Sequence, residues 1–459
     1  MEKSKSLLKI FRGLFSFRDF VYILQLEEYY SFNYFSVLRI FFFRRFLERH
    51  DKLNWTLRAK ATFLVSLLLF LFSILGTGFM LENWLPALRF GLAFILGCFM
   101  IPIWVGLANV ILYYLDKLLK LYIRNKAENF VKINSKAKIV AIAGSFGKTT
   151  TKNFIFRLIR YNYKVQTVEG NVNTPTGIAY WILKNLDKTA DIILVEMDTY
   201  EAGEIAKSCK ILPPDIAVIT SVGDQHLSRF GEVANLARAL WEIRSCSRRE
   251  GVTVMEESVK NLADSFGLTN EIGDRRLIAV PDNMLIYKNT VVNISDSLIS
   301  RECLALALKV ADLLDIPADF VQSSLKNLIS PDRRLHFMEE DGYKTIDDSY
   351  NISLTTAKYG VLAAKEMATK LGLKLLVITG GIPESGEGAN LEYGRFLKEN
   401  AGELIILDTC YRKDLIASFD GHKILNAGGL REAWLVVKKK FSPDEVLVLK
   451  QPELTDLSY

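Results

Sequence analysis

The segment Gly144-Ser145-Phe146-Gly147-Lys148-Thr149-Thr150 has the residue types and the spacing needed to bind a phosphate group. Its glycines let backbone N–H groups approach an anion closely, Lys148 adds a full positive charge, and a threonine hydroxyl can hold Mg²⁺. The common phosphate-loop pattern begins with one more glycine, whose position is taken here by Ile142. The segment predicts a nucleoside triphosphate enzyme, provided that a strand precedes it and a helix follows it.

Two further polar positions follow apolar runs along the chain. Glu196 ends the run Ile192-Ile193-Leu194-Val195-Glu196. An acid at the carboxyl end of a buried strand can hold Mg²⁺ opposite the phosphates. Asp224 and His226 come shortly after the next apolar run, at residues 216–220. A lone histidine is more often structural than functional, but this position after a strand end favours a functional role.

Alternating apolar runs and helix-like segments predict the elements that position these residues. The first set of runs comprises residues 139–143, 192–195, 216–220 and 252–255. The second set comprises residues 344–346, 374–379, 403–407 and 445–449. Such alternation is typical of mostly parallel sheets with helices on both faces. We therefore expect two α/β domains, at residues 136–333 and 334–459, divided at the polar segment Ser330-Pro331-Asp332-Arg333-Arg334.

The N-terminal part of the chain has a different composition. Residues 61–81 and 90–115 contain no charged side chain, and each stretch is long enough to cross a bilayer as a helix. Basic residues flank the pair on both outer sides, which by the positive-inside rule predicts a two-span hairpin with cytoplasmic flanks. We expect residues 1–130 to form this membrane region, with an interfacial stretch at 7–46. The alternative is a buried helical hairpin in a soluble protein.

Charge and cysteine usage narrow the possible partners. The net charge of +6 belongs mostly to the membrane-flanking segments, which indicates contact with anionic lipid rather than with nucleic acid. The five cysteines contain no Cys-x-x-Cys pair, which is typical of reduced thiols and argues against a zinc site or a disulfide framework. We expect a protein of the cell membrane whose catalytic domains face the cytoplasm.

From about residue 136 onward the chain resembles the Mur ligase family, which uses ATP to join an amino acid or peptide to a carboxylate. The resemblance rests on motifs that agree in order and spacing. They are the loop 144–150, the segment 170–178, Glu196 with Gly203-Glu204-Ile205, the segment 225–231, Arg334-Leu335, and Asp347-Asp348-Ser349-Tyr350-Asn351. The branch that adds D-alanyl-D-alanine to a UDP-muramoyl tripeptide is the most similar one.

The resemblance, which begins after the predicted helical membrane hairpin, implies a phosphate-loop ATPase domain and a smaller Rossmann-like domain, with ATP and Mg²⁺ as cofactors. It implies that Lys148 and His226 are catalytic and that Thr149, Glu196 and His226 bind metal. The nucleotide-binding residues would be Gly144, Ser145, Phe146, Gly147, Lys148, Thr149, Thr150, Arg334, Asp348 and Asn351. The substrate-binding residues would be Asn171, Asn173 and Thr174.

The implied activity is ATP-dependent formation of an amide bond through an acyl phosphate. The partners would be a UDP-linked muramoyl peptide and an amino acid or dipeptide acceptor, in peptidoglycan precursor synthesis at the cytoplasmic face of the membrane. Two alternatives stay open. One is a membrane-bound synthetase of the poly-γ-glutamate type. The other is a nucleotide-binding, catalytically weak membrane scaffold of cell-wall assembly.

Several positions depart from the family pattern. Leu240 stands where the family usually has a carbamylated lysine, and a leucine cannot orient a second metal ion. Asp198 stands where a glycine is usual. The segments Ser300-Arg301-Glu302-Cys303 and Ile352-Ser353-Leu354 replace the family's adenine-side and post-motif residues. The sequence therefore predicts nucleotide binding more firmly than it predicts turnover, and it leaves the amino acceptor open.

Overall fold

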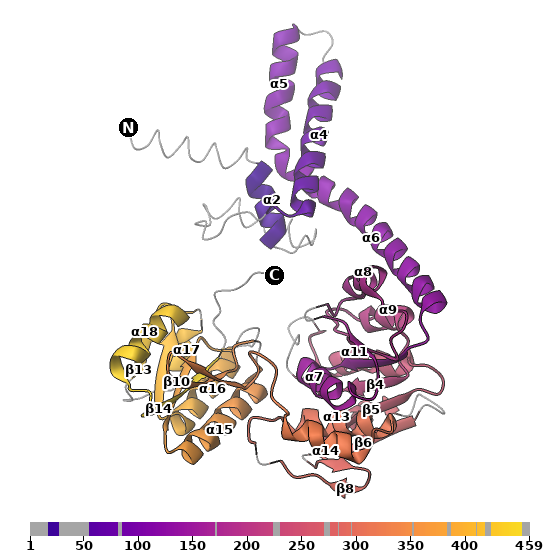
Figure 1. Ribbon diagram of the computed structural model, residues 1–459. Helices are drawn as coiled ribbons and strands as arrows, with labels where there is room; N and C mark the ends of the chain where they lie inside the picture. The colour runs from indigo at the N-terminus through magenta and orange to yellow at the C-terminus, as the bar shows by residue number, and fades with distance from the viewer. Residues whose placement is uncertain are drawn as a thin grey trace. The chain divides into compact units, whose positions relative to one another are not determined.

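The computed structural model describes residues 17–26, 55–80, 85–169, 172–223, 230–269, 276–282, 284–294, 296–350, 353–382, 387–409, 411–417 and 424–451. The chain divides into two compact units, residues 1–122 and 123–459. The first unit holds the apolar helices, and the second holds two α/β sheets (Figure 1).

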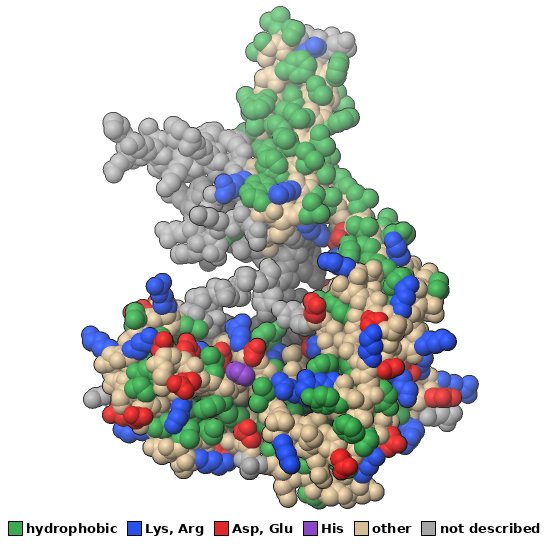
Figure 2. Space-filling view, viewed as in Figure 1, with side chains coloured by type: hydrophobic (Ala, Val, Ile, Leu, Met, Phe, Trp, Pro, Cys, Tyr) green, Lys and Arg blue, Asp and Glu red, His purple; other side chains and the backbone are tan. Residues whose placement is uncertain are grey.

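The first unit is built from helices α2 (Phe17–Leu26), α4 (Leu57–Met80), α5 (Pro86–Phe99) and most of α6 (Ile101–Asn134). Helices α4 and α5 lie side by side and present many hydrophobic side chains on the surface (Figures 1 and 2). Phe72 on α4 is 80% exposed. Among the described residues, α4 and α6 are long and apolar enough to cross a membrane, by length and composition.

The second apolar stretch differs from its prediction. We expected one helix over residues 90–115, but α5 ends at Phe99 and α6 begins at Ile101. The break coincides with Pro102, which has no N–H to donate to the preceding turn and whose ring crowds the carbonyl four residues earlier. Met100 closes α5 instead, with its N–H directed to the carbonyl groups of Leu96 and Gly97.

The first sheet of the second unit is parallel throughout, with the strand order β2-β3-β1-β4-β5-β6. Its strands are β1 (Lys138–Ala143), β2 (Val165–Thr167), β3 (Ile192–Glu196), β4 (Ile216–Ile219), β5 (Val252–Glu256) and β6 (Arg276–Val280). The central strands are apolar except for Lys138 at the start of β1 and Glu196 at the end of β3, because helices cover both faces.

Alternate residues of β1 divide between the two cores. Ile139, Ala141 and Ala143 face one core, and Val140 and Ile142 face the other. The first core is closed by α8 (Pro175–Asn185), α9 (Glu204–Ile211), α11 (Val233–Ser245) and α12 (Glu257–Ser265). The second core is closed by α7 (Lys148–Ile159), α13 (Arg301–Leu313) and α14 (Ala318–Lys326), beside the small hairpin of β7 (Ile286–Tyr287) and β8 (Thr290–Val291).

The second sheet has the order β13-β12-β11-β14-β10-β9 and is parallel except for β9, which pairs antiparallel with β10. Its strands are β9 (His336–Glu340), β10 (Tyr343–Asp347), β11 (Lys374–Thr379), β12 (Glu403–Leu407), β13 (Ile424–Ala427) and β14 (Val446–Lys450). Its helices are α15 (Leu354–Leu371), α16 (Glu387–Asn400), α17 (Arg412–Ala417) and α18 (Leu430–Lys440). The predicted α/β class, with a parallel-sheet domain, a further sheet domain and apolar N-terminal helices, is confirmed. The division at residue 333 stays a prediction.

The C-terminal end of α6 packs on the first core through Ile123, Ala127 and Val131, which are all buried. We expect Ile123→Ala to lower the free energy of unfolding by about 2–4 kcal/mol, because it removes buried methyl groups and leaves a cavity. Ile133→Ala is the matched control on the same helix, since Ile133 is 82% exposed, and its effect should stay within about 0.5 kcal/mol. Urea unfolding of the full-length protein in detergent, followed by tryptophan fluorescence, measures both. Equal effects would contradict this packing.

Candidate active site

The phosphate-binding segment forms the turn between β1 and α7, as its sequence context requires. Gly144 and Gly147 have φ angles of 146° and 82°, a region that favours glycine. A Cβ atom on Gly144 would lie 2.1 Å from Thr220 Oγ1. The turn is fastened to the end of β4, because Ser145 N donates to the carbonyl of Ser221 at 3.0 Å. The glycine backbone angles and the contacts with Thr220 and Ser221 together fix the conformation of the loop.

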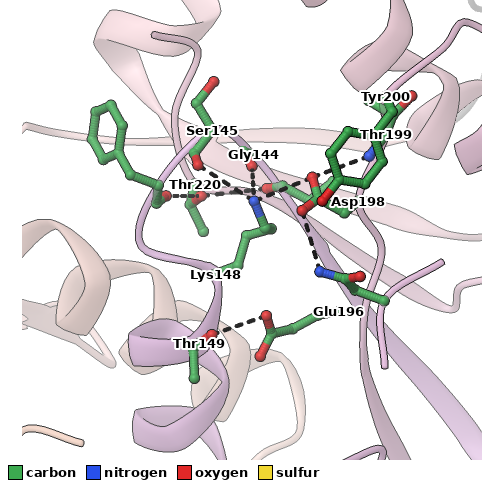
Figure 3. A network of polar contacts seen from close by, with 12 residues as sticks. Gly144, Ser145, Lys148, Thr149, Glu196, Asp198, Thr199, Tyr200 and Thr220 are labelled. Atoms are coloured by element: carbon green, nitrogen blue, oxygen red, sulfur yellow. Dashed lines mark hydrogen bonds and ion pairs between the residues drawn. The ribbon is translucent and has the colours of Figure 1, made fainter. Parts of the chain in front are cut away.

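Lys148 is buried, and its ammonium group folds back over the loop (Figure 3). Its Nζ atom donates to the carbonyl of Gly144 at 2.5 Å and to that of Ser145 at 3.3 Å. The same atom forms an ion pair with Asp198 Oδ1 at 3.4 Å. Asn173 Nδ2 donates to the other oxygen of Asp198 at 3.2 Å. The acid that replaces a usual glycine therefore pairs with the phosphate-loop lysine.

Glu196 lies at the end of β3 and is 3% exposed. Its Oε2 atom accepts a hydrogen bond from Thr149 Oγ1 at 3.0 Å, and its Oε1 atom is 2.8 Å from Lys152 Nζ (Figure 3 shows the threonine contact). Arg334 Nη2 donates to Thr149 Oγ1 at 3.1 Å. The structure thus brings together Thr149, Glu196 and Arg334, which are widely separated in the sequence.

The Thr149–Glu196 pair fits the geometry of a magnesium ion. Mg²⁺ binds oxygen at 2.0–2.1 Å in octahedral geometry, which places neighbouring ligands about 2.9 Å apart. The two side-chain oxygens are 3.0 Å apart. Among the described residues, no group of three or more His, Cys, Asp or Glu side chains could hold a metal. An ion here would take its other ligands from phosphate and water, which is the usual arrangement for Mg²⁺.

Asp348 directly follows β10 of the second sheet and is buried, at 7% exposure. Its Oδ1 atom accepts a hydrogen bond from Leu335 N at 3.3 Å. Burial raises the pKa of Asp348 to about 8, although the Leu335 N–H and the charge of Arg334 lower it. Arg334 stacks over the ring of Tyr350, with its guanidinium carbon 4.3 Å from the ring centre. This contact holds Arg334 between Asp348 and the phosphate loop.

A cavity of about 620 Å³ lies beside the phosphate loop. Its lining includes Phe146, Gly147 and Thr150 from the loop and the start of α7, and Arg334 and Asp348 from the chain that leads into the second sheet. A pocket of this size is ordinary for a small-molecule or cofactor site. Five of the predicted nucleotide residues therefore line one cavity.

The remaining predicted residues divide into two groups. Asn171, His226 and Asn351 lie outside the described residues. Thr174 is the N-cap of α8 and accepts a hydrogen bond from Gly177 N, beside Asn173.

Lys152, which sequence reasoning missed, is the buried partner of Glu196. Its spacing of four residues from Lys148, one turn along the same helix, is the signal that could have found it.

Leu240, on α11, is 1% exposed and belongs to the apolar core that includes Val195 and Met197. Two residues further on, Glu242 accepts hydrogen bonds from the backbone N–H groups of Gly203 at 2.6 Å and Ala206 at 3.1 Å, and so caps the start of α9. This part of α11 therefore serves packing and helix capping in this chain.

The parallel sheet, the glycine loop at the start of α7 and the threonine–carboxylate pair define a phosphate-binding α/β domain joined to a second α/β domain. Residues 142–274 match the family model of the Mur ligase middle domain. This part of the chain is therefore similar to the Mur ligase middle domain, and the relatives described next are similar over a longer part of the chain.

Two similar curated proteins carry the name UDP-N-acetylmuramoyl-tripeptide--D-alanyl-D-alanine ligase. The Bacillus subtilis protein is 26% identical over 265 residues, which cover 54% of this chain and 57% of that relative. The Escherichia coli protein is 24% identical over 348 residues, which cover 70% of this chain and 73% of that relative. The match thus spans little more than half of the Bacillus relative.

Solved structures agree on the fold. The MurF ligase from Thermotoga maritima, crystallised in complex with ADP, has a TM-score of 0.62 at 21% identity and covers 72% of this chain and 80% of that one. A MurF structure from Acinetobacter baumannii has a TM-score of 0.59 at 19% identity and covers 73% and 77%.

The raised pKa of Asp348 predicts a pH-dependent stability difference. Between about pH 4 and about pH 8 the folded protein holds a proton on this carboxyl group that the unfolded chain releases. The free energy of unfolding of the wild type, relative to that of Asp348→Asn, should therefore fall as the pH rises through this range. Denaturant titrations without nucleotide measure it, and Asp444→Asn, at an exposed position, controls for the loss of one carboxylate. A flat difference would contradict the assignment.

The burial of Leu240 predicts that a lysine there is destabilising. Leu240→Lys should lower the free energy of unfolding by about 3 kcal/mol or more, because it buries an ammonium group among apolar side chains. Leu240→Met, which conserves volume and polarity, should cost less than about 1.5 kcal/mol. Chemical denaturation compares the two variants. Unchanged stability in Leu240→Lys would show that the position opens onto the site instead.

Proposed function

We propose that this protein is a membrane-anchored, ATP-dependent amide ligase that acts on a UDP-muramoyl-peptide-like carboxylate. The observation that carries the proposal is the meeting of Thr149, Glu196 and Arg334 beside the buried Lys148. It has further support in the relatives, which are named for joining D-alanyl-D-alanine to a UDP-N-acetylmuramoyl tripeptide. Peptidoglycan precursor synthesis is the process to which this activity would belong.

The chain's own groups suit phosphoryl transfer, which depends on positioning and on charge stabilisation. ATP would supply the phosphoryl group, and Mg²⁺, held by Thr149 and Glu196, would offset charge on the phosphates. Lys148 would exchange its contacts with the loop carbonyls for phosphate oxygens. Arg334 would add a second positive charge from the opposite side of the loop. His226 remains the proposed ligand for a second metal ion.

The proposed reaction has two steps. The substrate carboxylate attacks the terminal phosphorus of ATP, the bond to ADP breaks, and an acyl phosphate forms. The amine of the acceptor then attacks the acyl carbon, the bond to phosphate breaks, and the amine loses a proton. Asn173 and Thr174 lie next to Asp198, so we place the UDP-linked substrate on that side of the loop.

Membrane attachment is the second part of the proposal. Helix α4 and the α5–α6 stretch are strongly apolar, and large side chains such as Phe72, Phe79 and Phe94 are exposed on them. Exposed apolar surface of this kind is typical of a lipid-facing helix. Basic residues flank the pair, which favours a cytoplasmic position for the α/β domains.

A catalytically weak, nucleotide-binding scaffold is the alternative that one observation favours. Leu240 is part of the apolar core, so α11 offers no metal-orienting group at that position. Such a protein would bind ATP without forming product. The polymer synthetase hypothesis differs in its acceptor, because it requires glutamate instead of a dipeptide.

Measuring phosphate release by the full-length protein in detergent tests these three hypotheses. With Mg-ATP, the UDP-muramoyl tripeptide and D-alanyl-D-alanine, we expect turnover that requires both substrates. Lys148→Ala should lower the rate by about 10²–10³-fold, because it removes a charge that stabilises the transferring phosphoryl group. Lys184→Ala, at an exposed position, is the matched control and should retain the rate. Turnover only with glutamate would favour the polymer synthetase, and ATP binding without product for any acceptor would favour the scaffold.

A further inference from the structure

The middle of helix α6 presents large apolar side chains on the surface of the first unit. The start of the helix is packed: Ile101, Val105 and Asn109 are buried, and the first two belong to the apolar cluster around α4. Burial ends there, because every side chain of residues 111–122 is exposed or half-buried. Figure 1 shows α6 leaving the α4–α5 pair obliquely. About three turns of the helix therefore extend beyond its packed start.

A polar cluster marks the level at which α6 passes the start of α4. Arg58, in the first turn of α4, donates to Asn109 Oδ1 at 3.3 Å and to Asp116 Oδ2 at 3.2 Å. Lys120 Nζ forms an ion pair with the same Asp116 oxygen at 2.7 Å. Charged groups are costly at the centre of a bilayer, so this cluster belongs at the lipid head groups. The span would then end near Asn109, since α5 and residues 101–109 together match the length of α4.

The side chains of residues 111–122 divide into two arcs on the helix surface. At 100° per residue, the apolar residues occupy one arc of about 160°. The exposed members of this apolar arc are Ile111, Tyr114, Leu115, Leu118, Leu119, Leu121 and Tyr122. The other arc holds Tyr113 and the charged residues of this stretch, Asp116, Lys117 and Lys120, with Arg124 one turn further on. An exposed apolar arc opposite basic residues is typical of a helix that lies in the membrane interface.

We propose that residues 111–122 of α6 lie in the plane of the membrane surface, with the apolar arc among the acyl chains and the basic side chains at anionic head groups. The inference rests on the membrane attachment proposed above, to which it adds a surface-bound helix on the cytoplasmic side.

Two observations favour lipid over a protein as the occupant of the apolar arc. The arc belongs to the same unbroken helix as the end of the proposed span, so it begins at the membrane itself. The basic residues of the opposite arc outnumber its one acid, which complements the charge of anionic lipid. The tyrosines in the apolar arc, Tyr114 and Tyr122, are also of the type enriched where hydrocarbon meets water.

Quenching of tryptophan fluorescence by brominated lipids tests this arrangement on the full-length protein in vesicles of phosphatidylcholine and phosphatidylglycerol. Leu118→Trp adds an indole within the apolar arc, and Lys117→Trp is the matched control on the charged arc. Both positions are exposed, so neither variant alters a core, and the wild type provides the signal of the native tryptophans.

A surface helix buries its apolar side about 5–10 Å into the boundary between head groups and acyl chains, so lipid brominated near the head group should quench the indole at position 118 at least about twofold more than the indole at position 117. Lipid brominated near the chain end should quench the indole at position 118 less than head-group-brominated lipid does. Vesicles of phosphatidylcholine alone should give weaker quenching at position 118, because the basic side chains lose their anionic partners.

Four results would overturn the inference. Equal quenching at the two positions would indicate a helix surrounded by lipid, as in a membrane span. Stronger quenching at position 118 by the chain-end lipid would place the helix inside the hydrocarbon. Little quenching at either position would mean that protein covers the apolar arc, and recovery at a lower protein-to-lipid ratio would identify a second copy of this chain. Quenching that is independent of phosphatidylglycerol would remove the role of the basic side chains.

The failure of the proposed membrane attachment has a separate signature. A wild-type protein that does not float with the vesicles in a density gradient would contradict the attachment itself. A protein that floats with them but gives any of the four results above would contradict only the surface position of residues 111–122.

Discussion

The buried contact between Glu196 and the start of α7 is the interaction on which the site depends. A carboxylate at 3% exposure is costly to bury unless its charge is compensated. Lys152 compensates it with an ion pair at 2.8 Å, and Thr149 adds a hydrogen bond at 3.0 Å. Both partners stand on α7, so the contact also fixes the helix against the end of β3. Loss of Lys152 would leave a buried charge unmatched, and loss of Thr149 would remove a hydrogen bond to the buried carboxylate.

Sheet topology places this contact where a ligand can reach it. Strand β1 lies between β3 and β4, and Ile142 pairs in register with Glu196. The carboxyl ends of β3 and β4 therefore flank the loop that leaves β1. Strands β2 and β3 lie on one side of β1, and β4 to β6 lie on the other, so the order of the connections reverses at β1. Such switch points form the ligand crevice of open α/β sheets. The position of the phosphate site follows from the strand order.

Local patterns predicted much of this arrangement. The apolar run before the glycine loop and the acid after the next buried strand could both be found in the sequence, because each depends on a few adjacent residues. Strand β9 was not predicted. It is joined to β10 by a turn near Asp341 and pairs with it antiparallel, and its side chains alternate between half-buried and exposed. Lys152 was missed because only the fold shows that it faces Glu196. The break at Met100 depends on a single proline within an otherwise uniform apolar stretch.

The charges of the site show how Asp198, which departs from the Mur ligase pattern, is accommodated. The structure has two buried ion pairs here, Lys148 with Asp198 and Lys152 with Glu196, and in each pair the two charges offset one another. A triphosphate adds several negative charges to this balanced set, and Lys148 can offset them only by giving up Asp198. In the proposed function, Arg334, which contacts Thr149, would offset part of the remaining charge, and a divalent cation held by Thr149 and Glu196 would offset the rest. In the proposed function, nucleotide binding would therefore depend on the chain around Arg334 as well as on the phosphate loop.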